Sequence, residues 1–210
     1  MSKYYKLNNL PENRRWENES VFGKARDHQP INEINNNFDQ NVLYYLGEKV
    51  INHLADSLVL EKLFQGQSRG QFNDFSFFTA PAYKALEGFL FQIAKDLDLP
   101  SSRNSNLAGS YYFDEDKIDK HIDKLLKELN ETTDKEKKLS TYEKRDIKDR
   151  IKEMKGFLQH YRNTPAHFYG ESIDTIEIAH RNIMIIYGAI DNTAKILLKA
   201  GLIQIKEDIH

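Results

Sequence analysis

The sequence contains no cysteine, which excludes a disulfide framework, a thiolate metal site and a cysteine nucleophile. Proline and glycine are also scarce, at 5 and 10 of 210 residues, and this scarcity favours long helices with short connections. No run of about 18 apolar residues occurs, and the N-terminal stretch MSKYYKLNNLPENRRW lacks the apolar centre of a secretory signal. We therefore expect a soluble cytoplasmic protein with no membrane segment.

A strong charge of one sign is absent as well, because the formal net charge is only −2. Without an overall positive field, any RNA-binding site must be a local patch. Hydrophobic residues make up 40% of the chain and charged residues 30%, enough for a core beneath a heavily charged surface. At about 150 residues per domain, the length suits one domain, or one domain with an arm.

Hydrophobic residues recur at helical spacing in five segments, about 36–64, 80–98, 113–129, 141–163 and 172–200. In the second segment, for example, one face carries Ala82, Leu86, Phe89, Leu90, Ile93 and Leu97. Residues 1–35 are polar and rich in asparagine, with no sustained period. We therefore predict an all-α bundle of about five helices over residues 36–210, preceded by a polar N-terminal arm over residues 1–35.

Local residues predict where several of these helices begin and end. Thr79 and Pro81 are expected to open the second helix, and Ser140 or Thr141 to cap the fourth. Ser172 can cap the last helix. Gly201 is expected to end it.

The stretch 161-YRNTPAHFYG-170 follows the fourth helical segment. The apolar face of that segment carries Ile147, Ile151, Met154 and Leu158, and the same spacing continues to Arg162. A guanidinium on a core-facing stripe needs a partner, because an unpaired buried charge is costly. Pro165 disfavours a helix at this point. We therefore expect a helix end and a tight turn that place Arg162 and His167 at one pole of the molecule.

Arg162 and His167 can also have purely structural roles. Arg162 can be a cation at a helix C-terminus, where it meets the helix dipole favourably, and His167 can be a turn residue bonded to the main chain. A metal site built from His160 and His167 is not expected, because no carboxylate accompanies them at ligand spacing. The sequence also lacks a glycine-rich phosphate loop and a His-Glu-x-x-His motif. No metal and no cofactor is therefore predicted.

The order Arg162, Asn163 and then His167 after four intervening residues resembles the signature of the HEPN superfamily of helical ribonucleases and nucleotide-binding domains. That signature is an arginine, a polar residue, and a histidine after four to six intervening residues. The stretch PAYKALEGFLFQIAKDL also resembles a helix of RNase LS-type toxins, a HEPN group of toxin–antitoxin systems. In that helix a basic residue and a glutamate three positions later accompany the motif. Lys84 and Glu87 match them, although arginine is expected at position 84, and lysine cannot bind phosphate as a bidentate fork.

The resemblance implies a HEPN-like bundle and a metal-independent endoribonuclease that cleaves single-stranded RNA. Such cleavage needs a base, an acid and a cation beside the phosphate. By resemblance, His167 is the acid–base group, Arg162 clamps the phosphate, and Asn163 fixes the geometry of that pair. Glu87 orients His167 or Arg162, and Lys84 supports the phosphate.

The motif supplies one histidine per chain, whereas the reaction needs both a base and an acid. HEPN nucleases are typically dimers. We therefore expect a homodimer with its twofold axis near Arg162 and His167. The last helix adds a second argument, because Met184, Ile185, Ile186 and Tyr187 are consecutive apolar residues around it. Such a helix needs either a core on both sides or a partner subunit.

Other interpretations stay open beside this one. Lys84 and Glu87 can form an ordinary surface ion pair. In HEPN toxins whose antitoxin is a small nucleotidyltransferase, a tyrosine two residues after the histidine can be blocked by AMP. Tyr169 matches that position. Alternatively, Tyr169 is an ordinary tyrosine of the core or of its rim. An antitoxin protein is therefore a second expected partner besides RNA. The competing classes are a HEPN domain that binds RNA, nucleotide or protein without cutting, and a helical bundle that only binds other proteins.

Overall fold

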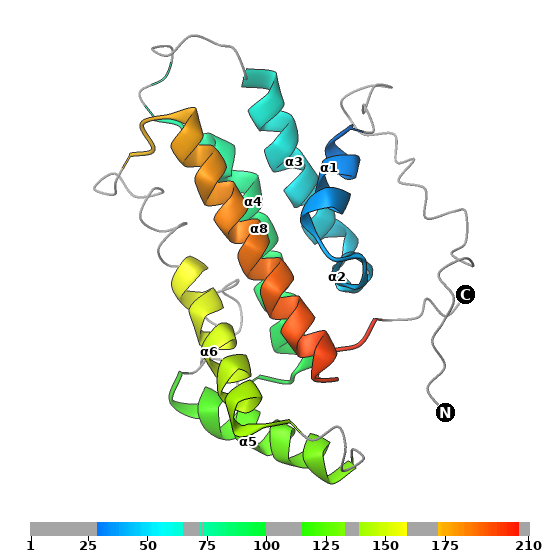
Figure 1. Cartoon of the computed structure of the whole chain (residues 1–210). Helices are drawn as coiled ribbons and strands as arrows, with labels where there is room; N and C mark the ends of the chain where they lie inside the picture. Colours follow the sequence, from blue (N-terminus) through cyan, green and yellow to red (C-terminus); the bar gives the residue numbers. More distant parts are fainter. Residues whose placement is uncertain are drawn as a thin grey trace, which may run out of the picture.

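The computed structural model describes residues 29–64, 72, 74–99, 115–132, 139–158 and 172–205, and within them the chain forms α-helices and no strand (Figure 1). The prediction of an all-α protein is thus confirmed. The helices are α1 (Gln29–Asn37), α2 (Gln40–Tyr45), α3 (Glu48–Phe64), α4 (Ser76–Asp96), α5 (Glu115–Thr132), α6 (Thr141–Leu158) and α8 (Ile176–Lys199). None of the helices in the described part of the chain is long and apolar enough to cross a membrane.

The long helices α4 and α8 lie against each other at the centre of the bundle (Figure 1). Both contact α3 on one side and α6 on the other, and α2 also packs against α8. Helix α1 covers α3, and α5 is joined to the bundle through its contact with α6. Helix α8 is thus enclosed by neighbours. Ile186 and Tyr187 are buried, and Met184 and Ile185 are partly buried, so the protein's own core supplies much of the cover that this helix needs.

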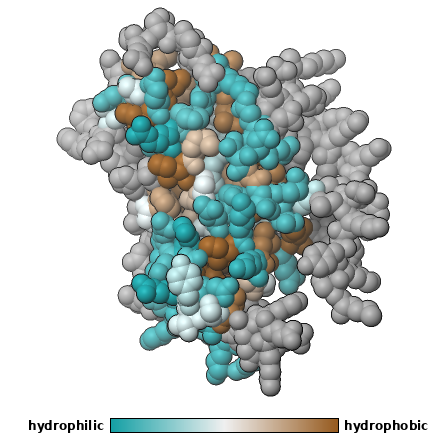
Figure 2. All heavy atoms as spheres, viewed as in Figure 1, coloured by the Kyte–Doolittle hydropathy of each residue, from teal (hydrophilic) through white to brown (hydrophobic). Residues whose placement is uncertain are grey.

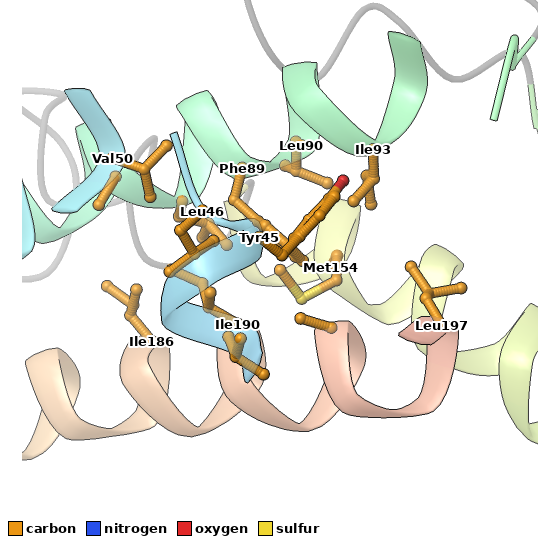
Figure 3. Packing of buried hydrophobic residues seen from close by; sticks show 14 of the residues in the cluster. Tyr45, Leu46, Val50, Phe89, Leu90, Ile93, Met154, Ile186, Ile190 and Leu197 are labelled. Atoms are coloured by element: carbon orange, nitrogen blue, oxygen red, sulfur yellow. The ribbon is translucent and has the colours of Figure 1, made fainter. Parts of the chain in front are cut away.

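The main core lies between these helices. Figure 3 shows Tyr45 and Leu46 between α4 and α8, with Met154 of α6 nearby. Burying one large apolar side chain contributes about 1.5–3 kcal/mol, so the many buried residues along α4 and α8 dominate the stability of this arrangement. The Tyr45 hydroxyl reaches the edge of the core and donates to Asp96 Oδ2 at 3.0 Å. Burial raises the pKa of this phenol, and the Asp96 charge raises it further.

The prediction of one helix over about 36–64 is wrong, because the structure divides this segment into α1, α2 and α3. Asp39 has an extended backbone, and its side chain accepts a hydrogen bond from the Asn41 N–H at 2.9 Å. Its own N–H donates to Asp191 Oδ1 in α8 at 2.8 Å. A second break follows at Leu46, which is also extended. The apolar spacing runs through both breaks, which is why the segment reads as one helix.

Helix α1 lies at the end of the stretch that the sequence assigns to an arm. Its residue Ile34 is only 1% exposed and belongs to the main core. The stretch from Gln29 to Asn37 is therefore a helix that packs on the bundle through Ile34. Residues 1–28 of the predicted arm lie outside the described residues.

Helix α4 begins at Ser76, earlier than the start predicted near residue 80, so Pro81 lies inside the helix. The Asp74 carboxylate accepts a hydrogen bond from the Ser76 N–H at 2.8 Å. The Thr79 hydroxyl donates to the Ser76 carbonyl at 2.7 Å. These bonds stabilise the added first turn, where main-chain groups lack helical partners.

The caps of the other helices agree only partly with prediction. Ser140 precedes α6 and exchanges hydrogen bonds with Glu143, an arrangement known as a capping box. The cap of α8 is Thr175, whose hydroxyl accepts from the Ile178 N–H at 3.2 Å, and the prediction of Ser172 is wrong. Gly201 follows the end of α8 with a φ of 71°, as a glycine after a helix C-terminus commonly does.

A second, smaller core lies where α4 and α8 begin. It consists of Phe78, Ile173 and Ala179, all buried. The Phe75 N–H donates to the Ile173 carbonyl at 2.8 Å, and the Ile173 N–H donates to Asp74 Oδ1 at 3.3 Å. These contacts attach the chain just before α8 to the first turn of α4.

Candidate functional site

Helix α4 carries the two described residues that the sequence assigns to the site. Lys84 is exposed and Glu87 is half-buried. Because the two residues are three apart, they lie on the same side of the helix. The opposite side is buried in the main core through Ala82, Ala85, Leu86, Phe89, Leu90 and Ile93. A rigid, well-packed helix thus holds Lys84 and Glu87 at the edge of the bundle.

The motif itself lies outside the described residues. This holds for Arg162, Asn163, His167 and Tyr169, and for His160 as well. The predicted position of Arg162 and His167 at one pole therefore stays a prediction, as do the predicted roles of these residues.

The described chain on either side of the motif is connected with α4, through helix α6 before the motif and through Ile173 after it. Before the motif, Leu158 ends α6, and α6 packs against α4 and α8 through Ile151 and Met154. After the motif, Ile173 is bonded to Phe75 at the start of α4. The segment that carries the motif is thus joined at both ends to elements that contact α4.

Aromatic side chains surround the first turn of α4. Phe77 lies with its ring centroid 4.2 Å from that of Phe78 and 5.2 Å from that of Phe72. Phe78 is buried, whereas Phe72 and Phe77 are each 37% exposed. An aromatic surface is therefore open to solvent at the end of α4 that meets the chain after the motif.

Several basic residues on α6 are paired with acids. Lys148 lies 2.5 Å from Asp123 of α5, and Lys152 lies 2.7 Å from Asp119 of the same helix. Figure 2 shows the face with α8 in front, where hydrophilic residues surround separate hydrophobic patches. Because α6 mixes cations with acids, its described residues form no uniformly positive surface for RNA.

A buried polar cluster lies between α3 and α8, and no motif in the sequence predicts it. The Tyr187 hydroxyl lies 2.6 Å from the Leu54 carbonyl oxygen and 3.0 Å from Ser57 Oγ, which itself lies 2.7 Å from that carbonyl oxygen. Two hydroxyl protons serve these three contacts. Burial raises the pKa of the Tyr187 phenol, and the Ser57 hydrogen bond opposes that rise. Tyr187 is flanked by apolar residues in the sequence, so the pattern predicts only a hydrophobic residue of the stripe and not its hydrogen bonds.

A second unforeseen contact joins His180 of α8 to Glu61 of α3. His180 Nδ1 lies 2.8 Å from Glu61 Oε1, and the Glu61 side chain is 12% exposed. The sequence assigns His180 no catalytic part. In the part of the chain that the structure describes, no three histidine, aspartate or glutamate side chains gather in a way that could hold a metal ion. The His180–Glu61 pair therefore links α8 to α3, and among the described residues it is not part of a metal-binding cluster.

No family model, curated protein or solved structure matches this chain significantly.

Proposed function

We propose that this protein is a metal-independent endoribonuclease of the HEPN type that cleaves single-stranded RNA in the cytoplasm. The observation that carries the proposal is the order of Arg162, Asn163 and His167 directly after the apolar stripe of α6, in a chain whose described part is all-helical. This order combines two kinds of side chain that RNA cleavage needs. Arginine is a cation that binds phosphate, and histidine is the residue type whose unperturbed pKa lies near neutral pH.

The arrangement around α4 supports the same proposal. Lys84 and Glu87 share one side of α4. The motif lies between the end of α6, a helix that contacts α4, and Ile173, whose carbonyl accepts a hydrogen bond from Phe75 at the start of α4. We propose that the motif works beside this side of α4. There Glu87 would orient His167 or Arg162, and Lys84 would support the phosphate.

The chemistry requires two proton transfers. A base removes the proton of the ribose 2′-hydroxyl, whose oxygen attacks phosphorus, and an acid protonates the departing 5′-oxygen. The products are a 2′,3′-cyclic phosphate and a 5′-hydroxyl. Arg162 would stabilise the charge that develops on the phosphate oxygens. His167 of each chain supplies one proton-transfer group, so a homodimer would supply both the base and the acid.

The biological role that we propose is that of a toxin or defence ribonuclease held in check by an antitoxin protein. Tyr169 lies two residues after His167. An AMP group attached to its hydroxyl would place a negatively charged phosphate beside the proposed RNA site, where it would compete with the RNA backbone. Tyr169 is therefore the proposed modification site.

The test is cleavage of a defined single-stranded RNA by the purified protein in the presence of EDTA. We expect fragments with a cyclic phosphate at the 3′ end, which acid treatment opens. A strict requirement for a divalent metal ion would refute the mechanism.

One observation favours the second candidate, a HEPN domain that binds RNA, nucleotide or protein without cutting. Lysine stands at position 84, where the resemblance predicts arginine, and a point charge gives less geometric control over phosphate than a fork. RNA binding by the wild-type dimer with no cleavage under any condition would favour this candidate.

A further inference from the structure

We propose that His180 of α8 and Glu61 of α3 form a second proton-transfer site, in which the His180 ring removes a proton from a ribose 2′-hydroxyl of bound RNA. The inference rests on the proposed ribonuclease function and revises one part of it. The second proton-transfer group comes from the described fold of the chain itself, with His180 as the base and His167 as the acid. A partner subunit is then not needed to supply that group.

The geometry of the pair is that of a histidine oriented by a carboxylate. His180 Nδ1 lies 2.8 Å from Glu61 Oε1. A carboxylate this close favours a proton on Nδ1 of the neutral ring, which leaves Nε2 as the nitrogen that can accept another. When Nε2 takes up a proton, the same carboxylate stabilises the imidazolium that forms. The pair therefore has the two parts of a general base, an acceptor nitrogen and a group that orients it.

The two side chains differ strongly in burial. Glu61 is 12% exposed, whereas His180 is 48% exposed. Removing a carboxylate from water costs free energy, and a permanent cation would offset that cost better than a histidine, which is charged only when protonated. A pair that served only to join two helices would gain more from a lysine or an arginine. The observed pair instead keeps the carboxylate inside and presents the imidazole to solvent.

Another histidine–carboxylate pair, also on α3, provides a comparison. His53 Nδ1 lies 3.8 Å from Asp56 Oδ2, and these side chains are 38% and 47% exposed. The distance is longer than in the His180–Glu61 pair, and the carboxylate is open to water. A contact of this kind is an ordinary surface pair. His53 and Asp56 are therefore the matched controls for His180 and Glu61.

The His180–Glu61 pair lies at the end of the bundle where the chain after the motif joins it. Helix α3 ends there, and α4 and α8 begin there (Figure 1). Glu61 directly follows Leu60, which packs against the smaller core, and His180 directly follows Ala179, which belongs to it. The same core contains Ile173, the first buried residue after the motif. The pair is thus held beside the attachment point of the motif segment.

A short length of chain ties the motif to this end of the bundle. His167 precedes Ile173 by six residues, and six residues span at most roughly 20 Å. Ile173 is itself attached to the start of α4, because its carbonyl accepts a hydrogen bond from the Phe75 N–H. The proposal brings His167 and His180 to one phosphodiester, and this tether is short enough to permit it.

The proposed step is balanced in protons and bonds. His180 Nε2 takes the proton of the 2′-hydroxyl while the 2′-oxygen forms a bond to phosphorus. The bond between phosphorus and the 5′-oxygen breaks, and protonated His167 gives that oxygen its proton. The products are a 2′,3′-cyclic phosphate and a 5′-hydroxyl. Proton exchange with water then returns both histidines to their starting states.

Replacement of His180 is the first test. His180→Ala should lower the kcat of RNA cleavage by roughly 100-fold or more, the usual scale for loss of an acid–base group, with KM nearly unchanged. Imidazole in the buffer should restore part of the rate, because it supplies the missing base. A purely structural pair would lose melting temperature instead and would show no rescue. His53→Ala is the control and should keep the wild-type rate with or without imidazole.

Replacement of Glu61 tests its role as the positioning residue. Glu61→Gln keeps the size of the side chain, removes its charge and should lower kcat at least tenfold, whereas Asp56→Asn should have no effect. Because Glu61 acts through His180, the double variant E61Q/H180A should be no slower than His180→Ala alone. A double variant that is slower by the full factor of Glu61→Gln would overturn this role.

A third test does not depend on cleavage. Diethyl pyrocarbonate modifies exposed histidine rings, and mass spectrometry of the peptides measures the rate at each one. The probe is a single-stranded RNA analogue with 2′-deoxyribose, which cannot be cleaved by this route. With the analogue at ten times its Kd, modification of His180 should slow roughly tenfold, and that of His53 should not change. Equal modification of His180 with and without bound RNA would overturn the site.

The outcomes separate the pair from the proposed ribonuclease function. Cleavage by the wild type, with an unchanged rate in folded His180→Ala protein, would overturn the role of the pair and leave the ribonuclease function standing. Protection of His180 by RNA, with no cleavage by the wild type, would support RNA binding at the pair and refute the ribonuclease function. If His180→Ala fails to fold, Glu61→Gln and the protection experiment decide the matter.

Discussion

The Tyr187 hydroxyl of α8 lies 2.6 Å from the main-chain carbonyl oxygen of Leu54 in α3, and the two helices meet through this contact in the interior. Ser57 Oγ lies within hydrogen-bond distance of both groups. Tyr187→Phe keeps the aromatic ring against Phe38, whose centroid lies 5.2 Å away, and removes only the hydroxyl. We expect the free energy of unfolding in urea to fall by about 1 kcal/mol.

Ser57→Ala is the partner variant in a double-mutant cycle. Since the two hydroxyls share the Leu54 carbonyl, the effects of the single changes should not add, and a coupling of about 0.5 kcal/mol or more is expected. Strict additivity would show that the two hydroxyls act independently.

The Glu143 carboxylate should give a small stability term that depends on pH. Hydrogen bonds from the Ser140 main chain and hydroxyl lower its pKa from the ordinary 4.5, with Lys199 acting in the same direction. A carboxylate with a lowered folded-state pKa stabilises the protein above its unfolded-state pKa and loses that effect as the pH falls through the folded-state value. Glu143→Gln should therefore be less stable than wild type near neutral pH, and the difference should vanish in strong acid.

The proposed catalytic pair gives the largest expected change in activity. His167→Ala and Arg162→Ala should each lower RNA cleavage by roughly 100-fold or more, the usual scale for loss of an acid–base group or a charge donor. The melting temperature should stay nearly unchanged. If either variant unfolds and the wild type never cuts, the residue is structural.

The two residues on α4 should matter less to the rate. Glu87→Ala is expected to slow cleavage by a smaller factor than the loss of His167, because in the proposed site Glu87 orients the motif and does not itself transfer the proton. Lys84→Arg is expected to be tolerated, because it keeps the charge and adds the fork that suits phosphate. A loss of cleavage on Lys84→Arg equal to that of His167→Ala would contradict this assignment.

Two helical glycines should respond differently to replacement by alanine. A Cβ added at Gly188 in α8 would meet nothing within 4 Å, so Gly188→Ala should stabilise the protein by about 0.5–1 kcal/mol through helix propensity. A Cβ at Gly88 in α4 would lie 3.1 Å from Val50 Cγ2. The same change there should give a smaller gain or a loss. Equal gains at both sites, measured by thermal unfolding, would contradict this account.

Periodicity predicts the core-facing residues of the long helices well. On α4 every residue of the predicted stripe is buried, and Leu97 just beyond the helix end is buried with them. On α5 the helical spacing of Ile118, Ile122, Leu125 and Leu129 predicts that these residues face the core. Ile122 is buried as predicted, but Leu125 is only partly buried, and Leu126, which the spacing leaves out, is 1% exposed. The error arises because neighbouring leucines fit the same period, and only the packed partner helix chooses between them.

The breaks between α1, α2 and α3 could not be predicted from local sequence. The Asp39 N–H is held by the Asp191 carboxylate, which lies 152 positions away in the chain and also accepts from Lys195. A contact of this kind depends on the finished fold. The early start of α4 has a similar cause, because Asp74 bonds both Ser76 at the helix start and Ile173 beyond the motif.

The candidate site, too, could be predicted from the sequence only in part. The resemblance of PAYKALEGFLFQIAKDL to a helix of RNase LS-type toxins singles out Lys84 and Glu87, and the structure shows that α4 holds them at the edge of the bundle. The contact of His180 with Glu61 had no sequence signal, because it joins residues of different helices that no short motif relates. Distances among Arg162, Asn163 and His167 belong to residues outside the described part of the chain, so their roles stay predictions.

The position of α8 has a consequence for how the newly made chain folds on the ribosome. This helix is the last in the described order, yet it packs against α2, α3, α4 and α6. While residues before Ile176 are being synthesised, the apolar faces of those earlier helices lack their shared neighbour. The main core can close only after α8 has left the exit tunnel, and until then the growing chain exposes surfaces that chaperones recognise.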